Sequence, residues 1–558
     1  MTHDGIRSAL RVTVLVAAFA ATSTVMGQNT TPVFRDPLGQ LTVADREVPA
    51  KLYGFQSKYF DLSGYLRFRG DVFHDFGLGH GDAPDGEGRV WPAASSAAAD
   101  VTVQSANLRL RLRPELHYGD EVRVVAEIDF LDNVVMGSTP RGFPRVVQAP
   151  LASGSSSQEP PASGVNSWAD GVRVKKAWGE LVLPFGALVV GRMGNDWGLG
   201  MVASSGEGID DDWDESVDRV GFVTSVFDHF VGVSWDFNAT GPTSGSASNR
   251  GGQAFNLTTR DDVNTLSVAV LRMLPPEVVR SKLRAGKAVF NYGGWFTWRR
   301  QAEDVPGYYL LGADGLDLDW GDGDFVRRDL DLFGGDVWLR LNWRGLRVEA
   351  EAAYVHGRAG DVTATPGVSL GEVTFDQWGL VAQVEWQPWQ RIRLTCRGET
   401  GVASGDSAWG FGAYAPLDGT GGAGRIEGPQ IALPGDRSID NFRFSPNCHV
   451  DHILWRRIVG TFTDGVYAKG RVRWHPIDEI RLDFAAVYSR TLFDESAPGL
   501  AKPLGVELSF DGTWFHRGGF EATVAYAVLL PLAGFRNVHT GADPTPAHLA
   551  EARLAFRF

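Results

Sequence analysis

The stretch from residue 107 to residue 132 reads NLRLRLRPELHYGDEVRVVAEIDFLD and alternates apolar with charged residues on both sides of a GDE turn. An alternation of period two is typical of a β-strand whose two faces meet different surroundings. A three-residue turn places both apolar sets on one face, and it sets Arg113 opposite Glu127 and Arg111 opposite Asp129. Opposite charges at facing positions stabilise a sheet. The stretch therefore predicts an antiparallel hairpin with one apolar and one charged face.

Three further stretches follow the same rule, with a short turn between two alternating segments. The facing pairs that they predict are Arg340 with Glu349 around Arg344-Gly345, Glu385 with Arg393 around Pro388–Gln390, and Arg471 with Asp483 near Pro476. Four hairpins that obey one rule indicate a single large antiparallel sheet.

About eighteen such segments follow one another between residue 58 and residue 558. They begin near residues 62, 101, 122, 171, 187, 217, 230, 262, 287, 332, 346, 372, 391, 463, 479, 503, 519 and 547. Short connections alternate with long ones, as in outer-membrane barrels with short periplasmic turns and long external loops. In hydrocarbon a sheet must close on itself to pair its backbone groups. We therefore expect an all-β, antiparallel, up-and-down transmembrane barrel of about eighteen strands, with sixteen as the alternative.

The chain begins with the pattern of a secretory signal. Arg7 and Arg11 precede an apolar run, and small residues follow this run up to Gly27. We expect residues 1–27 to be a signal peptide for Sec-type export, residues 28–57 to be a periplasmic N-terminal segment and residues 58–558 to be the barrel. The expected location is the bacterial outer membrane, with its lipid as a partner.

The chain ends EARLAFRF, which again alternates. Leu554, Phe556 and Phe558 fall on one face, and the last strand is expected to pair with the first and close the ring. An ending of this kind resembles the signal by which the barrel-assembly machinery recognises outer-membrane proteins. Six tryptophans near the predicted short turns are expected to form a periplasmic girdle. They are Trp178, Trp343, Trp386, Trp389, Trp474 and Trp514.

Composition excludes other classes of protein. A net charge of −14 argues against nucleic-acid binding, which requires a basic surface. Two cysteines, Cys396 and Cys448, do not make a disulfide scaffold.

The segment KAWGELVLPFGALVVGRM resembles a strand–turn–strand of Gram-negative porins. The blocks GRMGNDWGLGM, RGETGVASGD and NFRFSPNCHVDHILWRRIVGTFTDGVYAKG resemble an uncharacterised family of bacterial outer-membrane β-barrels, with a looser similarity to alginate-export barrels. The resemblance implies an architecture and no particular activity.

The charged face of the first two strands and the last strand is rich in arginine. Closure of the ring brings them onto one wall of the lumen: Arg67, Arg69, Arg109, Arg111, Arg113, Arg553 and Arg557. Glu127 and Asp129 neutralise two of them, and the remainder would attract anions through a channel with low-dielectric walls. The alternative is that all seven are held in a structural lattice of salt bridges.

Two segments carry side chains that could bind a metal ion. The loop GEGIDDDWDES offers Asp210, Asp212 and Asp214 as weak Ca²⁺ ligands, although a solvated external loop is the favoured interpretation. The segment CHVDH holds chemically able zinc ligands but has no second cluster to complete a site. We therefore expect no cofactor.

The predicted function is a porin-like channel for passive diffusion of small polar solutes, with anions preferred. One alternative is a structural or adhesion barrel plugged by the long stretch 402–462. The other is an outer-membrane enzyme, for which no G-x-S-x-G motif or convincing partner set is present.

Overall fold

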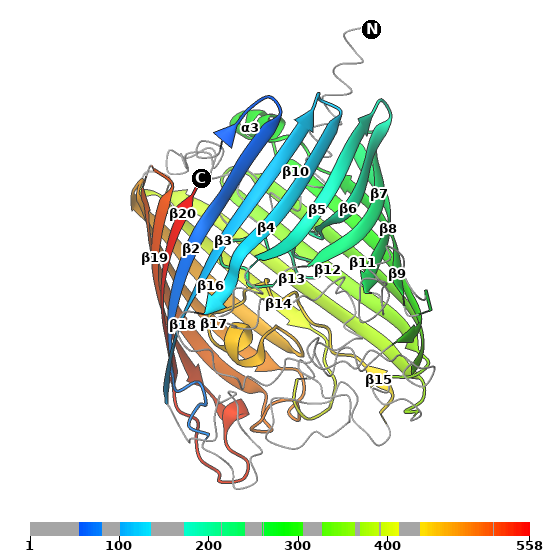
Figure 1. Ribbon diagram of the computed structural model, residues 1–558. Coiled ribbons are helices and arrows are strands. Elements are labelled where there is room, and N and C mark those ends of the chain that lie inside the picture. The colour runs from blue at the N-terminus through cyan, green and yellow to red at the C-terminus, as the bar shows by residue number, and fades with distance from the viewer. Residues whose placement is uncertain are drawn as a thin grey trace.

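The protein is described by a computed structural model (Figure 1) that covers residues 55–80, 101–135, 172–213, 215–239, 259–260, 262–304, 326–362, 369–389, 392–411, 436–516 and 518–558. The predicted signal peptide and most of the predicted N-terminal segment lie outside these residues. Within them, one sheet contains twenty strands, of which two are only two residues long. The eighteen long strands form the wall of a barrel.

The long strands of the first half are β2 (Phe60–His74), β3 (Thr102–Tyr118), β4 (Val122–Val135), β5 (Val172–Leu183), β6 (Gly186–Gly194), β7 (Ser216–Val226), β8 (His229–Ala239), β9 (Val263–Arg272) and β10 (Val289–Asp304). Those of the second half are β11 (Val326–Trp343), β12 (Leu346–Ala359), β13 (Val373–Trp389), β14 (Leu394–Ala403), β16 (Gly465–Ile477), β17 (Ile480–Thr491), β18 (Pro503–His516), β19 (Phe520–Pro531) and β20 (Ala547–Arg557). The short strands are β1 (Phe55–Gln56) and β15 (Ser438–Ile439).

The ring closes through the first and last long strands. β2 and β20 are antiparallel neighbours, with Leu66 facing Phe556 and Arg69 facing Arg553. Beyond this ladder, the Gly64 N–H donates to the Phe558 carbonyl at 2.8 Å, and the Phe558 N–H donates to the Gly64 carbonyl at 3.0 Å. The predicted eighteen-stranded antiparallel barrel and its seam are confirmed. The role of the ending in assembly stays a prediction.

The outer face of the wall is apolar and aromatic, as a surface against lipid requires. Trp343, Trp386, Trp474 and Trp514 lie on this face near short turns and are 41–53% exposed. Trp178 is buried inside the barrel instead, so its assignment to the girdle was wrong. The side chain of Trp389 is outside the described residues. No helix of the described part is long and apolar enough to span a bilayer.

The predicted register is correct in two hairpins and wrong in two. Arg111 faces Asp129, and Arg340 faces Glu349. The facing pairs before and after Arg113 and Glu127 have the predicted register, in which these two residues lie opposite each other.

Glu385, however, faces Arg397 and not Arg393, while Asp483 faces Arg473 and not Arg471. Both turns lie later in the chain than predicted, because the strands continue past Pro388 and Pro476 until Trp389 faces Leu394 and Ile477 faces Ile480; each ladder also slips by one residue beside its turn. A β-bulge adds a residue that alternation alone does not reveal.

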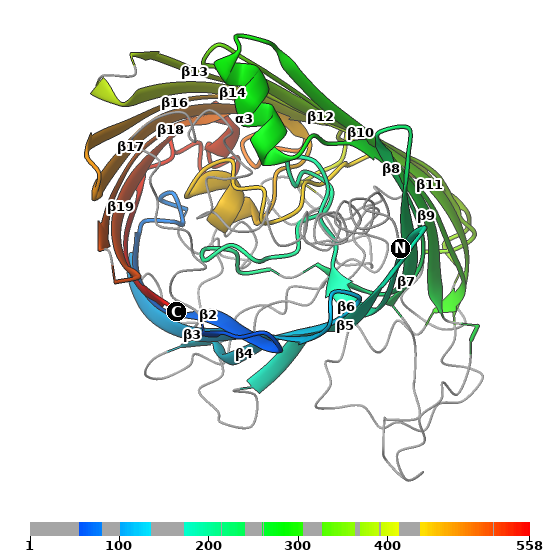
Figure 2. The same ribbon diagram turned by 90° about the horizontal axis from the view of Figure 1, so that it is seen from above.

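One short-turn connection holds a helix that the alternating pattern did not predict. Helix α3 (Pro276–Arg284) begins after Pro275, and it buries Val279 and Leu283 in a small cluster with Val289 at the start of β10. Proline suits the first helical turn because its missing N–H has no intrahelical partner there. Figure 2 shows α3 at the end of the barrel that carries the short turns.

Two chain segments fold into the barrel and divide its lumen (Figure 2). We call residues 195–213, which follow β6, the lumen loop. We call residues 441–464, which precede β16, the inner segment. It contains a short π-helix, Leu454–Val459.

Candidate functional site

The lumen loop is attached to the wall by two buried carboxyl groups. The Trp197 indole N–H donates to Asp336 of β11 at 2.8 Å, and the backbone N–H of Leu199 donates to Glu351 of β12. Asp336 and Glu351 also hydrogen-bond to each other. Gly198 has φ +56°, a left-handed conformation that glycine adopts readily, and it allows the loop to turn back at this point.

The acidic part of the lumen loop lies on the arginine-rich wall. Its backbone carbonyls accept hydrogen bonds from three of the wall arginines, namely Ile209 O from Arg67 at 2.7 Å, Asp211 O from Arg109 at 2.7 Å and Gly206 O from Arg111 at 2.8 Å. Its carboxylates form ion pairs with the wall, namely Asp212 with Arg69 at 2.9 Å, Glu207 with Arg113 at 3.1 Å, and Asp210 with Arg553. The loop therefore supplies partners to six of the seven arginines.

Asp212 is the centre of this lattice. Besides Arg69 it lies 3.5 Å from Arg67 and 3.9 Å from Arg109. Burial would raise the pKa of Asp212, but the surrounding arginines, with Arg69 foremost, hold it well below its usual value. Asp212 is thus a fixed negative charge that holds several mutually repelling cations together.

The seven predicted arginines face inward, but not toward open water. Arg557 is paired with Glu521 of β19 at 2.9 Å, and the other six are at most 6% exposed. The expectation that Glu127 and Asp129 leave most of this stripe uncompensated was wrong, because the acidic loop covers it. The expectation of a solvated external loop was wrong for the same reason. The alternative of a salt-bridge lattice describes this wall.

The inner segment is attached to the wall at β18, two strands from β20. Glu507 of β18 accepts the backbone N–H groups of His452 at 2.7 Å and Ile453 at 2.9 Å, and Asp451 accepts that of Trp455 at 2.9 Å. These carboxyl groups satisfy N–H groups at the start of the π-helix, which have no partner within the helix. A cluster of edge-to-face aromatic rings packs behind them: Phe411, Phe442, Phe444, Trp455, Phe462 and Tyr467. Of the predicted plug, 402–462, the described residues are 402–411 and 436–462, and residues 441–462 of the inner segment lie inside the barrel.

The CHVDH residues belong to this packing. His452 lies 3.4 Å from Asp511, whose charge raises the pKa of His452 against the effect of burial. Cys448 is partly buried against the aromatic cluster, and both cysteines are free. No three His, Cys, Asp or Glu side chains of the described ranges gather in an arrangement suited to a metal ion. Asp214 is outside those ranges, so Ca²⁺ binding by its loop stays a prediction.

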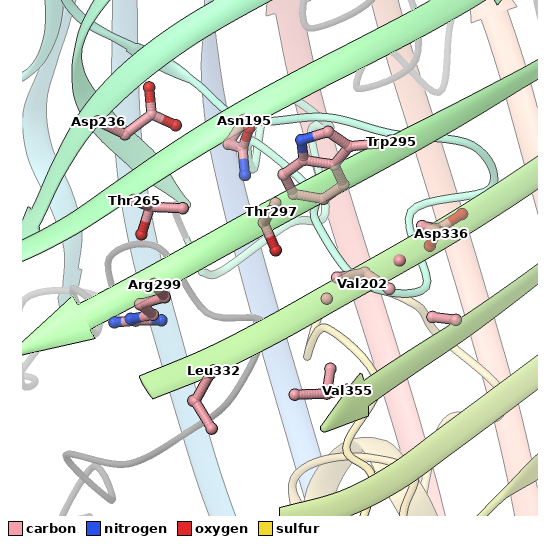
Figure 3. A pocket seen from close by; sticks show the side chains of 13 residues that line it. Asn195, Val202, Asp236, Thr265, Trp295, Thr297, Arg299, Leu332, Asp336 and Val355 are labelled. Carbon is pink, nitrogen blue, oxygen red and sulfur yellow. The ribbon is translucent and has the colours of Figure 1, made fainter. Parts of the chain in front are cut away.

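Open space remains between the lumen loop and the wall formed by β7 to β11. Two partly open cavities lie there, and both are lined by Asn195 and Trp295. Figure 3 shows the first, with Asp236, Thr265, Thr297, Arg299 and Asp336 around it. This side of the lumen contains water-sized space, and the surface around it is mostly apolar with polar groups at several places.

A second feature of the lumen is a group of arginines near the short-turn end of β16 and β17. Arg471, Arg473 and Arg481 approach the single carboxylate of Asp483 at 3.7, 2.8 and 3.2 Å. These arginines are 18–32% exposed, whereas Asp483 is 8% exposed. We call Arg471, Arg473, Arg481 and Asp483 the basic cluster.

Sequence reasoning found Arg471 and Asp483 as a salt-bridge pair but missed the rest of the basic cluster and all of the cavity residues. Alternation places Ser267 and Thr297 on inward faces, and this signal was available. Alternation cannot predict which residues contact an inward face from across the lumen, and the faces that stay open are those that the lumen loop does not cover.

Comparisons with known proteins found similarity to solved structures alone. No family model and no curated protein matches the chain. Among solved structures, it is similar to a BenF-like porin from Pseudomonas fluorescens Pf-5, with 7% identity, a TM-score of 0.45 and coverage of 89% of this chain and 98% of that one. It is also similar to OccAB3 of Acinetobacter baumannii, with 10% identity, a TM-score of 0.43 and coverage of 89% and 99%. These identities are too low to match single residues.

Proposed function

We propose that this protein is a porin-like channel of the bacterial outer membrane for the passive diffusion of small polar solutes. The observation that carries the proposal is the pair of partly open cavities between the lumen loop and β7 to β11, in which polar groups are set into a largely apolar lining. A barrel of about this size leaves an aqueous passage where loops do not fill it. The hydrogen-bonding groups of this wall suit water and polar solutes.

Planar-bilayer conductance of the purified protein tests this proposal. We expect stable single-channel currents in KCl. A protein that inserts, as judged by protease protection in liposomes, yet passes no current would contradict it.

We further propose a preference for anions, which rests on the basic cluster and not on the arginines of the lattice. The cluster presents three partly exposed guanidinium groups to the lumen around Asp483. Helix α3 adds Arg280, Lys282 and Arg284 at the same end of the barrel. A mouth with one sign of charge and low-dielectric walls concentrates counter-ions.

Reversal potentials in a salt gradient test the preference. The double variant Arg473→Gln, Arg481→Gln should move the reversal potential toward that of a non-selective channel. Arg471 remains in it as a partner for Asp483. The matched control is Arg300→Gln, which removes an exposed arginine from the outer face of β10 and should leave the potential unchanged. An unchanged potential in the double variant would refute the anion preference.

A structural barrel with a filled lumen is the second candidate. It is favoured by the aromatic core that the inner segment forms inside the wall. The conductance measurement separates the two candidates, because a filled barrel passes no current.

A further inference from the structure

Three rows of inward residues cross the open wall at directly facing positions. The middle row consists of Gly221, Ser234, Ser267, Thr297 and Gly334, one from each strand between β7 and β11. Hydroxyl groups thus occupy three neighbouring strands at one height, and glycine ends the row on both sides. Small residues leave room in front of the hydroxyls, and this room forms part of the two cavities.

The two flanking rows differ in character. On the side of the long loops lie Arg219, Asp236, Thr265 and Arg299 at facing positions. On the side of the short turns lie Gly232, Ala269, Trp295 and Asp336 at facing positions. A solute in the cavities therefore meets polar groups on one side, hydroxyls behind it and an indole on the other side.

Trp295 is held as a fixed platform. Its ring lies 6.1 Å from that of Trp197 at 40°, and Trp197 is itself fixed by its hydrogen bond to Asp336. Trp295 is only partly buried and borders both cavities. An indole is a rigid apolar surface that loses little conformational entropy when it binds a ligand.

The charges around the cavities are compensated within the protein. Asp236 accepts two hydrogen bonds from Arg219, at 2.7 and 2.8 Å. Burial, together with the charge of Glu207, raises the pKa of Asp196 in the lumen loop well above its usual value, so this carboxyl group is largely neutral. A charged solute would lose hydration without gaining an uncompensated partner.

The hydroxyl row contains a group that lacks a partner. Ser267 is 6% exposed, and its Oγ makes no hydrogen bond to any described residue. A buried hydroxyl without a partner is unfavourable by about 1–3 kcal/mol, so a solute hydroxyl or a water molecule at this place would be stabilised.

We propose that Trp295 and the row Ser234, Ser267 and Thr297 form a binding subsite for neutral, hydroxylated solutes of sugar size. The apolar face of the sugar ring lies on the indole, and its hydroxyls exchange hydrogen bonds with the row and with Asn195. This inference rests on the proposed channel function, and it names a class of solute that the passage retains briefly. The basic cluster, which favours anions, lies on β16 and β17, away from this wall.

Current blockade by a neutral trisaccharide, maltotriose, tests the subsite. We expect brief, concentration-dependent interruptions of the single-channel current. Trp295→Ala should weaken the blockade by roughly 3- to 10-fold, since stacking on an aromatic ring contributes about 0.5–1.5 kcal/mol. The matched control is Trp298→Ala. Trp298 is on the same strand but on the outer face, where it donates to Asp331, and its loss should leave the blockade unchanged.

Three results would overturn the subsite while leaving the channel intact. They are conductance without any blockade, equal blockade in the parent and Trp295→Ala, and stronger blockade by gluconate than by maltotriose. If the parent passes no current, the channel proposal fails, and titration calorimetry of maltotriose into the detergent-solubilised protein decides the subsite by itself. Binding heat that is lost in Trp295→Ala supports the subsite, and no heat in the parent refutes it.

Discussion

The two sides of the lumen use charge in opposite ways. On the wall of β2, β3 and β20, arginines are dense, and the lumen loop covers and neutralises them. On the wall of β7 to β11, charges are few and paired, and the wall stays open. In this barrel the highest density of lumenal charge therefore marks where the chain packs on itself, while the wall that stays open carries hydroxyls, an indole and a balanced ion pair.

The largest difference between the two sides is expected in stability. Asp212→Asn removes the carboxylate that Arg67, Arg69 and Arg109 share, and it should lower the free energy of unfolding by roughly 3–5 kcal/mol, as for other broken buried ion pairs. Ser267→Ala on the open side removes a buried hydroxyl that has no hydrogen-bond partner among the described residues, so it should not lower this free energy. Urea unfolding in lipid vesicles measures both. Equal effects would show that the two sides do not differ in packing.

The next effect concerns the two faces of one strand. Leu110→Arg places a charge against lipid and should cost roughly 2–4 kcal/mol near the bilayer midplane. From the sequence alone, the neighbouring substitution Arg109→Leu is expected to have only a mild effect on stability. The structure revises this, because Arg109 is 2% exposed and donates to the Asp211 carbonyl at 2.7 Å. Both variants should now be destabilising in the same unfolding assay, and a neutral Arg109→Leu would contradict the buried lattice.

The last effect is a pH dependence in the inner segment. Burial raises the pKa of Asp464, which precedes β16, to about 8. The folded protein then holds a proton that the unfolded chain releases above about pH 4. Stability from this group is present at low pH, and it falls by up to about 1.4 kcal/mol per unit as the pH rises toward 8.

Asp464→Asn, which mimics the protonated form, should remove this slope. Hydrogen exchange of residues 441–464 between pH 5 and pH 9 measures it. The parent should exchange faster as the pH rises, after correction for intrinsic rates, and the variant should not. Identical corrected profiles would show that Asp464 ionises freely in the folded state.

The wall could be predicted from the sequence because its signal is local. Each strand carries its own alternation, so the number of strands, the closing pair of β2 and β20, and the pairs Arg111–Asp129 and Arg340–Glu349 follow from short stretches of chain. The predicted register was wrong at Glu385 and Asp483, because the turns there lie beyond Pro388 and Pro476 and not at these prolines.

The interior could not be predicted, because it depends on contacts between distant segments. The acidic run near Asp210 has the composition of a solvated loop, and its burial is stabilised only because arginines more than a hundred residues away in the chain face it. The same holds for Trp295. The alternation of β10 predicts that it faces inward, but its exposure depends on the position of the lumen loop.

Chemical access from the lumen tests most directly the claim that only one side of it is open. Thr297→Cys lies on the open wall, and Ala555→Cys lies on β20, where Ala555 is fully buried beside Ile209 of the lumen loop. Both variants are made with Cys396 and Cys448 replaced by alanine. A charged methanethiosulfonate reagent should lower the single-channel conductance of Thr297→Cys and leave that of Ala555→Cys unchanged. Modification of Ala555→Cys with an unaffected Thr297→Cys would contradict the account.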